Sequence, residues 1–227
     1  MSNPPSLDPS IPFAPSELVL LNGDQFAKKV MMGNIQLMHT DASVSYSQLG
    51  EAILAAAELA VESSGNLQYE VRQEKAMLGL RKVNTLSAKS THAQNNWPEH
   101  SLESRLIQIA ESSEQDGESA KVSDLIYLWL GQDSGAPWQS VIAMVQSGLA
   151  DRDLLERSES TKLKVFTTIN YSLPSSTAEF AKQFPINSIQ ELLRYNENNR
   201  KEIWELIKNE NKKAIKQRTE QDDSDFD

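Results

Sequence analysis

The sequence predicts a mainly α-helical, single globular domain with small β-hairpins and an embedded winged-helix-like unit. Three observations support this fold class. Several segments place apolar residues three and four positions apart, which is the period of a helix with one buried face. Shorter segments alternate apolar and polar residues, as strands do. The length of 227 residues suits one large domain or two small ones, and it is enough to bury a core without disulfides.

Composition divides the chain into four parts. Residues 1–13 are rich in Pro and Ser, lack the basic and apolar regions of a signal peptide, and are predicted to form a flexible arm. The helical domain is expected over residues 14–195. A polar C-terminal helix is predicted over residues 196–218, and an acidic disordered tail over residues 219–227.

The N-terminal half is predicted to contain two helices with a short strand between them. Ser16 is a favourable N-cap for the first helix, and Asn22-Gly23 is a break that can end it. Residues 33–39 alternate as a strand does. The second helix, at residues 47–61, is the clearest, because its Ala and Leu residues recur at helical spacing. Its many small residues predict close packing against a neighbour.

A hairpin and another helix are expected next. Residues 67–71 alternate as a strand, and the apolar residues between 77 and 83 form its predicted partner. Residues 84–100 are predicted to be a polar loop. Residues 102–110 are amphipathic and predict a helix.

The winged-helix-like unit is predicted at about residues 121–173. Residues 122–130 are strongly apolar and predict one helix, and Pro137 fits the first position of the next. An extended segment begins at residues 154–156, residues 157–161 are turn-like, and the β-branched run after them completes a hairpin. Two helices followed by a hairpin are typical of a winged helix.

Charge and composition narrow the functional classes. The net charge of −10 disfavours binding to nucleic acid or to anionic membranes, both of which depend on Lys and Arg. The chain has no cysteine, which excludes disulfides, thiolate metal sites and a cysteine nucleophile, and which favours a cytoplasmic location. No stretch approaches the roughly 20 apolar residues of a membrane span.

Residues that could carry chemistry are sparse. His39, His92 and His100 do not have the spacing of metal ligands. The sequence holds neither a Gly-x-Ser-x-Gly nucleophile motif nor a phosphate-binding loop. Acidic pairs such as Glu51 and Glu58 are expected on solvated helix faces. The sequence therefore predicts a protein that is not an enzyme and that has no cofactor and no metal site.

A winged helix raises the alternative of a regulatory protein that contacts DNA or a protein partner. The helix expected in a DNA groove, residues 137–150, offers polar side chains such as Gln139 and Gln146 but no Lys or Arg. The candidate residues for contact with an anion or a partner follow that helix: they are Arg152, Arg157, Lys162 and Lys164. Because these cations are few, a packed scaffold or a protein-binding surface is the other interpretation of this unit.

The order of segments resembles the Golgi phosphoprotein 3-like family over about residues 14–180. The resemblance lies in residues 49–71 with Ala57-Glu58-Leu59-Ala60-Val61 and Gly65-Asn66-Leu67, residues 102–110, 122–131 and 138–155, and Tyr171-Ser172-Leu173. It implies a mostly helical globular fold. It also implies an adaptor function, since eukaryotic members of the family bind the phosphatidylinositol 4-phosphate headgroup and hold glycosyltransferases in the Golgi.

The positions that correspond to the headgroup contacts of the family carry other residues in this chain. The arginine of the first long helix falls near Ala52, the preceding aromatic residue near Ser43, and the later arginine pair near Gln139 and Ile142. We therefore expect a cytoplasmic, non-enzymatic binding or adaptor protein with a protein partner. An anionic lipid headgroup, and with it a peripheral membrane location, is implied by the resemblance.

Overall fold

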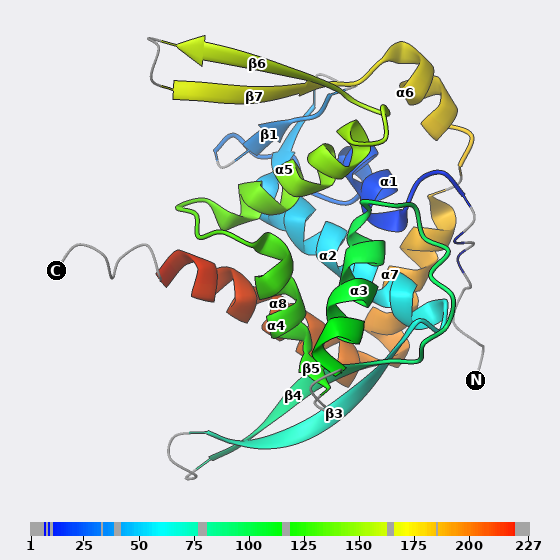
Figure 1. Cartoon of the computed structure of the whole chain (residues 1–227), viewed down its shortest axis with the longest axis vertical. Helices are drawn as coiled ribbons and strands as arrows, with labels where there is room; N and C mark the ends of the chain where they lie inside the picture. The colour runs from blue at the N-terminus through cyan, green and yellow to red at the C-terminus, as the bar shows by residue number, and fades with distance from the viewer. Residues whose placement is uncertain are drawn as a thin grey trace, which may run out of the picture.

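The computed structural model describes residues 7, 9, 11–32, 34–38, 42–76, 81–114, 119–162, 166–184 and 186–220. Over these residues the prediction of a mainly helical fold with small antiparallel sheets is confirmed. Helices form the body of the molecule, and two β-ribbons project from opposite ends of it (Figure 1). In chain order the elements are α1 (Pro15–Leu21), η1 (Gly23–Gln25), β1 (Asn34–Gln36), β2 (Ser43–Ser45), α2 (Tyr46–Ser63), β3 (Leu67–Ala76), β4 (Arg81–Ser90), α3 (Leu102–Glu114), β5 (Ala120–Lys121), α4 (Val122–Leu130), α5 (Pro137–Ala150), β6 (Glu156–Lys162), β7 (Phe166–Ser172), α6 (Ser175–Ala181), α7 (Asn187–Asn199) and α8 (Lys201–Glu220).

Helix α2 is the centre of the body and packs against α1, α3, α5, α7 and α8. The Oγ atom of Ser45 caps it by accepting a hydrogen bond from the N–H of Gln48 at 3.4 Å. Small residues let the neighbouring helices approach closely, as predicted. A Cβ atom added to Gly50 would lie 2.8 Å from Cε3 of Trp138 on α5, so this contact accommodates only glycine without rearrangement.

The long ribbon β3–β4 corrects the prediction for residues 84–100. Strand β4 pairs with β3 from Leu67↔Ser90 to Ala76↔Arg81, and β5 adds to its other edge. The Ser and Thr residues of this stretch are therefore strand residues up to Ser90. Thr85 and Ser87 are buried, because β4 lies between two strands and packs against α3 and α8. Residues 77–80, expected at the start of the partner strand, lie outside the described residues.

A small sheet precedes α2. Strand β1 pairs with β2, with Ile35 opposite Val44, which confirms a strand within residues 33–39; Gly33 and His39 themselves lie outside the described residues. Lys29 forms a bridge to the other side of Val44. The chain therefore crosses from one edge of β2 to the other between Lys29 and Asn34.

The elements of the predicted winged-helix-like unit follow in the expected order, with Pro137 at the start of α5. Strand β6 pairs with β7 from Glu156↔Ser172 to Lys162↔Phe166, and this ribbon forms its own two-stranded sheet. Residues 157–161 therefore belong to a strand and are not the predicted turn. Strand β5, which precedes α4, adds to the β3–β4 ribbon at the other end of the molecule (Figure 1).

The polar C-terminal helix predicted over residues 196–218 begins later, at Lys201, because residues 196–199 are the end of α7. The chain turns at Arg200, whose guanidinium donates two hydrogen bonds of 2.6 Å to Glu62 on α2. This turn lets both α7 and α8 pack on α2. Residues 219 and 220 continue α8, and the remainder of the expected acidic tail, residues 221–227, lies outside the described residues.

The length and composition of the described helices decide whether any of them could cross a membrane. None of these helices has both the length and the apolar composition that a transmembrane crossing requires. Of the two longest, α8 is amphipathic and packs on the core, whereas α2 lies within it and is buried at every residue from Ile53 to Val61. Ile207 and Ala214 on α8 are fully buried, which gives this polar helix its anchors in the core.

Candidate functional site

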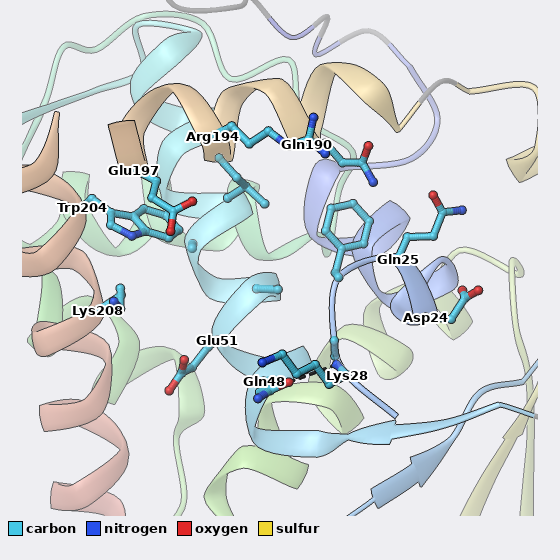
Figure 2. A pocket seen from close by; sticks show the side chains of 15 residues that line it. Asp24, Gln25, Lys28, Gln48, Glu51, Gln190, Arg194, Glu197, Trp204 and Lys208 are labelled. Carbon is cyan, nitrogen blue, oxygen red and sulfur yellow. Dashed lines mark hydrogen bonds between the residues drawn. The ribbon is translucent and has the colours of Figure 1, made fainter. Parts of the chain in front are cut away.

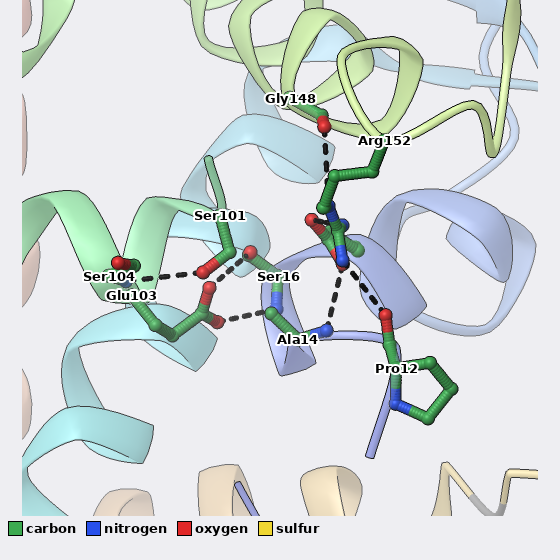
Figure 3. Close-up of polar contacts among 9 residues, drawn as sticks. Pro12, Ala14, Ser16, Ser101, Glu103, Ser104, Gly148 and Arg152 are labelled. Atoms are coloured by element: carbon green, nitrogen blue, oxygen red, sulfur yellow. Dashed lines mark hydrogen bonds and ion pairs between the residues drawn. The ribbon is translucent and has the colours of Figure 1, made fainter. Parts of the chain in front are cut away.

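The guanidinium of Arg152 is bound within the protein (Figure 3). It forms an ion pair with Glu17, donates to the carbonyl oxygen of Pro12 at 2.9 Å and donates to that of Gly148 at 3.3 Å. Its side chain is only 15% exposed. Arg152 thus fastens the end of α5 to the start of α1, and an external anion would have to displace Glu17.

A second buried carboxyl group lies beside this ion pair (Figure 3). Glu103 on α3 accepts hydrogen bonds of 2.8 Å from both the N–H and the hydroxyl of Ser16. Burial raises the pKa of Glu103 to about 7. Burial also raises the pKa of Glu17, and the charge of Arg152 opposes that rise. These contacts hold α1 between α3 and α5.

The other predicted cations lie on the β6–β7 ribbon, apart from Arg152. Arg157 is exposed and pairs with Glu159 at 3.0 Å. Lys162 is the last residue of β6, in register with Phe166. Lys164 lies outside the described residues. The structure therefore does not bring Arg152 together with Arg157 and Lys162 in one site.

The positions implied by the family resemblance lie on β2, α2 and α5. Ser43 begins β2 and Ala52 lies in the first half of α2. On α5, Gln139 is exposed and Ile142 is buried in the core. Helices α2 and α5 pack together, so these positions belong to neighbouring elements, but none of them supplies a positive charge.

The described histidines occupy loop positions with unusual backbone angles. His92 and His100 both have positive φ, and their Nε2 atoms lie 3.4 Å from Glu114 and 3.7 Å from Glu99. Among the described residues, no group of three or more His, Asp or Glu gathers in an arrangement that could hold a metal. His39 falls outside this part of the chain.

A cleft of about 800 Å³ opens beside α2, between the segment around η1 and helices α7 and α8 (Figure 2). Ala52 and Ala55 of α2 form its floor, and Phe26, Leu193 and Trp204 are its apolar walls. The polar lining residues are Asp24, Gln25, Lys28, Gln48, Glu51, Gln190, Arg194, Glu197 and Lys208. Each helix contributes residues at helical spacing, because one face of each turns toward the cleft.

Some polar groups of the cleft are already paired within the protein. Lys208 lies 3.1 Å from Glu205 and 5.9 Å from the centroid of the Trp204 ring. Glu51 lies 3.6 Å from Lys212. These contacts neutralise part of the rim and fix its shape.

Arg194 and Glu197 on α7 differ from these rim residues. Both are exposed, they lie one helical turn apart, and within the described chain their side chains make no hydrogen bond or ion pair. They therefore present opposite charges to whatever occupies the cleft. Sequence reasoning missed this site, because its charges lie on α7 and its alanine floor lies on α2, more than 130 positions earlier in the chain.

Glu58 corrects the expectation of a solvated acidic face on α2. It is 1% exposed, and its Oε2 atom accepts a hydrogen bond of 2.9 Å from the amide of Asn211 on α8. Burial raises its pKa to about 8. Glu51, on the same helix, lies at the cleft mouth, whereas α8 crosses α2 at Glu58. The spacing of the two residues could not reveal this difference.

An exposed apolar loop follows the cleft residue Lys28. The side chains of Met31 and Met32 are 97% and 89% exposed, and Lys28 and Lys29 beside them are also exposed. The side-chain amide of Asn34 donates to the carbonyl oxygens of Val30 and Met31, at 3.1 and 3.3 Å. We call residues 28–32 the methionine loop. Asn34 thus bonds to the backbone of this loop, whose methionines contact solvent.

Comparison with family models, with curated proteins and with solved structures finds no match for this chain. The cleft and the methionine loop are its two candidate contact surfaces, and Lys28 belongs to both.

Proposed function

We propose that this chain is a non-enzymatic binding or adaptor protein that holds a peptide segment of a partner protein in the cleft. One observation carries the proposal: an alanine floor with aromatic walls lies beside Arg194 and Glu197, whose opposite charges have no partner in the described chain. The volume of about 800 Å³ falls within the range of ligand-binding clefts.

The lining suggests the chemistry of the bound segment. A bulky apolar side chain fits over Ala52 and Ala55, between Phe26 and Trp204. Complete burial of such a side chain contributes roughly 1.5–3 kcal/mol. An acidic residue of the segment would pair with Arg194 and a basic residue with Glu197. Reversal of these charges in the segment would place like charges together and weaken binding.

A selection from random short peptides tests this proposal. We expect the protein to enrich peptides in which one apolar residue is flanked by an acidic and a basic residue. The double variant Arg194→Glu, Glu197→Arg should enrich the opposite charge order. Arg105→Glu, an exposed change on α3, is the matched control and should select as the unmodified protein does. Peptides that bind the double variant and the unmodified protein equally would contradict the proposal.

A second candidate function is contact with an anionic membrane surface, which the family resemblance implies. The methionine loop supports it, because two exposed methionines lie beside two exposed lysines. Each lysine near an anionic surface contributes about 1 kcal/mol, and the methionines can enter the interface. A cytoplasmic location with peripheral membrane contact belongs to this proposal.

Co-sedimentation with vesicles tests the membrane proposal. Vesicles of phosphatidylcholine alone, with phosphatidylserine, or with phosphatidylinositol 4-phosphate distinguish charge from headgroup recognition. We expect sedimentation with the anionic vesicles, and its loss in the double variant Met31→Asp, Met32→Asp. Leu128→Asp, at an exposed position on α4, is the control. Equal sedimentation of all three proteins would rule out the methionine loop as the contact.

We also propose a specific type for the helical domain and for the unit of two helices and a ribbon within it. The order of α2, β3, β4, α3, α4, α5, β6 and β7 supports a Golgi phosphoprotein 3-like domain with a winged-helix-like unit at about residues 121–173. For the alternative of DNA binding, the exposed residues Gln139 and Ala143 on α5 are uncharged. Phosphate contacts would then depend on the ribbon with Arg157 and Lys162, and binding that is absent at low salt would exclude this alternative.

A further inference from the structure

We propose that α8 is a proton-dependent latch, held against α2 while Glu58 carries a proton and loosened near the cleft when that proton is lost. The inference rests on the proposed function of the cleft, because α8 supplies two of its residues, Trp204 and Lys208. The contact between Glu58 and Asn211 lies one turn further along α8 than Ile207, which is fully buried.

The contact between α2 and α8 holds more acceptors than donors. Oε1 of Glu58, Oε2 of Glu210 and Oδ1 of Asn211 are buried and have no hydrogen-bond partner in the described part of the chain. The amide group of Asn211 already donates to the other oxygen of Glu58. An ionised carboxylate is an acceptor only, whereas a neutral carboxyl group supplies one donor. A proton on Glu58 therefore relieves the surplus of acceptors.

Loss of this proton leaves a negative charge in a dry interface. Burial is the main cause that raises the pKa of Glu58, and the nearby charge of Glu210 on α8 adds to it. Once Glu58 is ionised, its carboxylate and that of Glu210 on the facing helix repel each other. The buried charge of Glu58 is also more stable when water can reach it. Both effects oppose the contact between α8 and α2.

The surrounding ionisable groups do not neutralise Glu58. Lys213 on α8 lies 3.7 Å from Oε2 of Glu210, and Lys121 on β5 pairs with Glu74 on β3 at 2.9 Å. The hydroxyl of Tyr69 on β3 donates to the backbone carbonyl of Glu58 at 3.0 Å and not to its carboxyl group. None of these groups supplies a positive charge to the carboxylate of Glu58, so protonation is what neutralises it.

Both ends of α8 are held by contacts that do not depend on Glu58. At its start, Arg200 is bound to Glu62. Near its end, Arg218 donates to the carbonyl of Tyr127 at 3.1 Å and to Asp133 at 2.9 Å. The change should therefore be confined to the part of α8 between these two ends, which includes Trp204 and Lys208 at the cleft.

Spin-label distances test the latch without any ligand. Because the chain has no cysteine, Asn209→Cys on α8 and Gln108→Cys on α3, both exposed, give a unique labelled pair. We expect the distance between the labels to lengthen or broaden as the pH rises through about 8, the pKa of Glu58. Glu58→Gln, which keeps the shape of the neutral acid, should hold one narrow distance at every pH. Glu210→Gln should move the change to lower pH, because it removes a nearby charge that helps to raise the pKa of Glu58.

Two results would overturn the latch: distances in the unmodified protein that do not change with pH, or the same change in the Glu58→Gln variant. Peptide selection on both sides of the transition separates the two proposals. A pH-dependent distance with no peptide capture at any pH would support the latch and overturn the proposed function of the cleft. Label distances that stay constant with pH, together with peptide capture, would overturn the latch and support the proposed function of the cleft.

Discussion

Buried carboxyl groups give individual residues an unusual influence on this molecule. Glu17, Glu58 and Glu103 are almost fully buried, and burial raises the pKa of each. Glu17 is compensated by Arg152, whereas Glu58 accepts one hydrogen bond from the neutral amide of Asn211 and Glu103 accepts two from Ser16. Of these three acids, Glu17 has a cationic partner and the other two do not, so they should respond differently to substitution and to pH.

The pH dependence of stability follows from Glu58 and Glu103. Their pKa values are about 8 and about 7, above the ordinary value of 4.5, so the folded state binds these protons more tightly. Their stabilising contribution is fully present below about pH 4.5 and is lost as the pH rises through 7 and 8. We expect the free energy of unfolding, measured with urea, to fall over this range. In the Glu58→Gln variant, the free energy of unfolding should fall less at the upper end of this pH range. A free energy of unfolding that rises with pH over this range would contradict the raised pKa values of Glu58 and Glu103.

The ion pair of Arg152 with Glu17 should be costly to break. Arg152→Ala leaves the carboxylate of Glu17 buried without its partner, so we expect a loss of about 3–5 kcal/mol in the free energy of unfolding. Arg157→Ala on the ribbon, measured by the same chemical denaturation, should change it by no more than about 0.5 kcal/mol. Similar losses for the two variants would show that Arg152 is not structural.

Secondary-structure elements approach one another closely because small residues lie at their contacts. Gly50 lies beneath Trp138 where α5 crosses α2, and Gly148 lies against the backbone of His100. At Gly148 an added Cβ atom would lie 2.3 Å from the carbonyl oxygen of His100. Helix α5 is thus held on both sides by contacts that have no room for a side chain.

Substitution of Gly50 tests the packing of α5 on α2. Gly50→Ala places a methyl group 2.8 Å from Trp138, so we expect a loss of about 1–3 kcal/mol from overpacking. Gly65→Asn, at a position with positive φ and no neighbouring atom within 4 Å, is the control and should cost less, since asparagine tolerates this backbone conformation. Thermal unfolding followed by circular dichroism compares the stability of the two variants. Equal losses of stability would refute the close contact between Gly50 and Trp138.

At the scale of the whole molecule, one helical core carries the two ribbons. The β3–β4 ribbon is tied to the core through β5, α3 and α8, whereas the extensive contacts of β6 and β7 in the described chain are with each other. The stability of the core should therefore depend more on the β3–β4 ribbon than on the β6–β7 ribbon. The side chains of residues 156–160 are exposed along β6, which agrees with a ribbon outside the core.

Removal of the outer part of the β6–β7 ribbon tests this division. A variant in which a short glycine linker replaces residues 157–170 keeps the core residues Leu155 and Tyr171. We expect its free energy of unfolding to change by less than about 1 kcal/mol, because the side chains described in this segment, those of residues 157–160, 169 and 170, are exposed. Circular dichroism and tryptophan fluorescence should report one shared transition. A large loss of stability would show that the ribbon belongs to the core.

The sequence by itself was enough to predict the helical class and the positions of most elements. The spacing of Ala and Leu predicted α2, and Pro137 predicted the start of α5. Alternation predicted strands at residues 33–39 and 67–71, where β1 and the first half of β3 lie. These features are local, since helical periodicity and proline geometry depend on near neighbours in the chain. The part of β4 from residue 84 to residue 90 was missed, because its polar residues gain their strand environment from β3 and β5.

Only the tertiary structure decided which polar residues are buried and which are free. Arg152 meets Glu17, Glu58 meets Asn211, and the charges of α7 lie beside the alanine floor of α2, each across more than 130 residues of chain. Periodicity identifies the face on which a residue lies, but it does not identify the element that will cover that face. For this protein the candidate site arose from such long-range coverage, which is why the cations chosen from the sequence did not mark it.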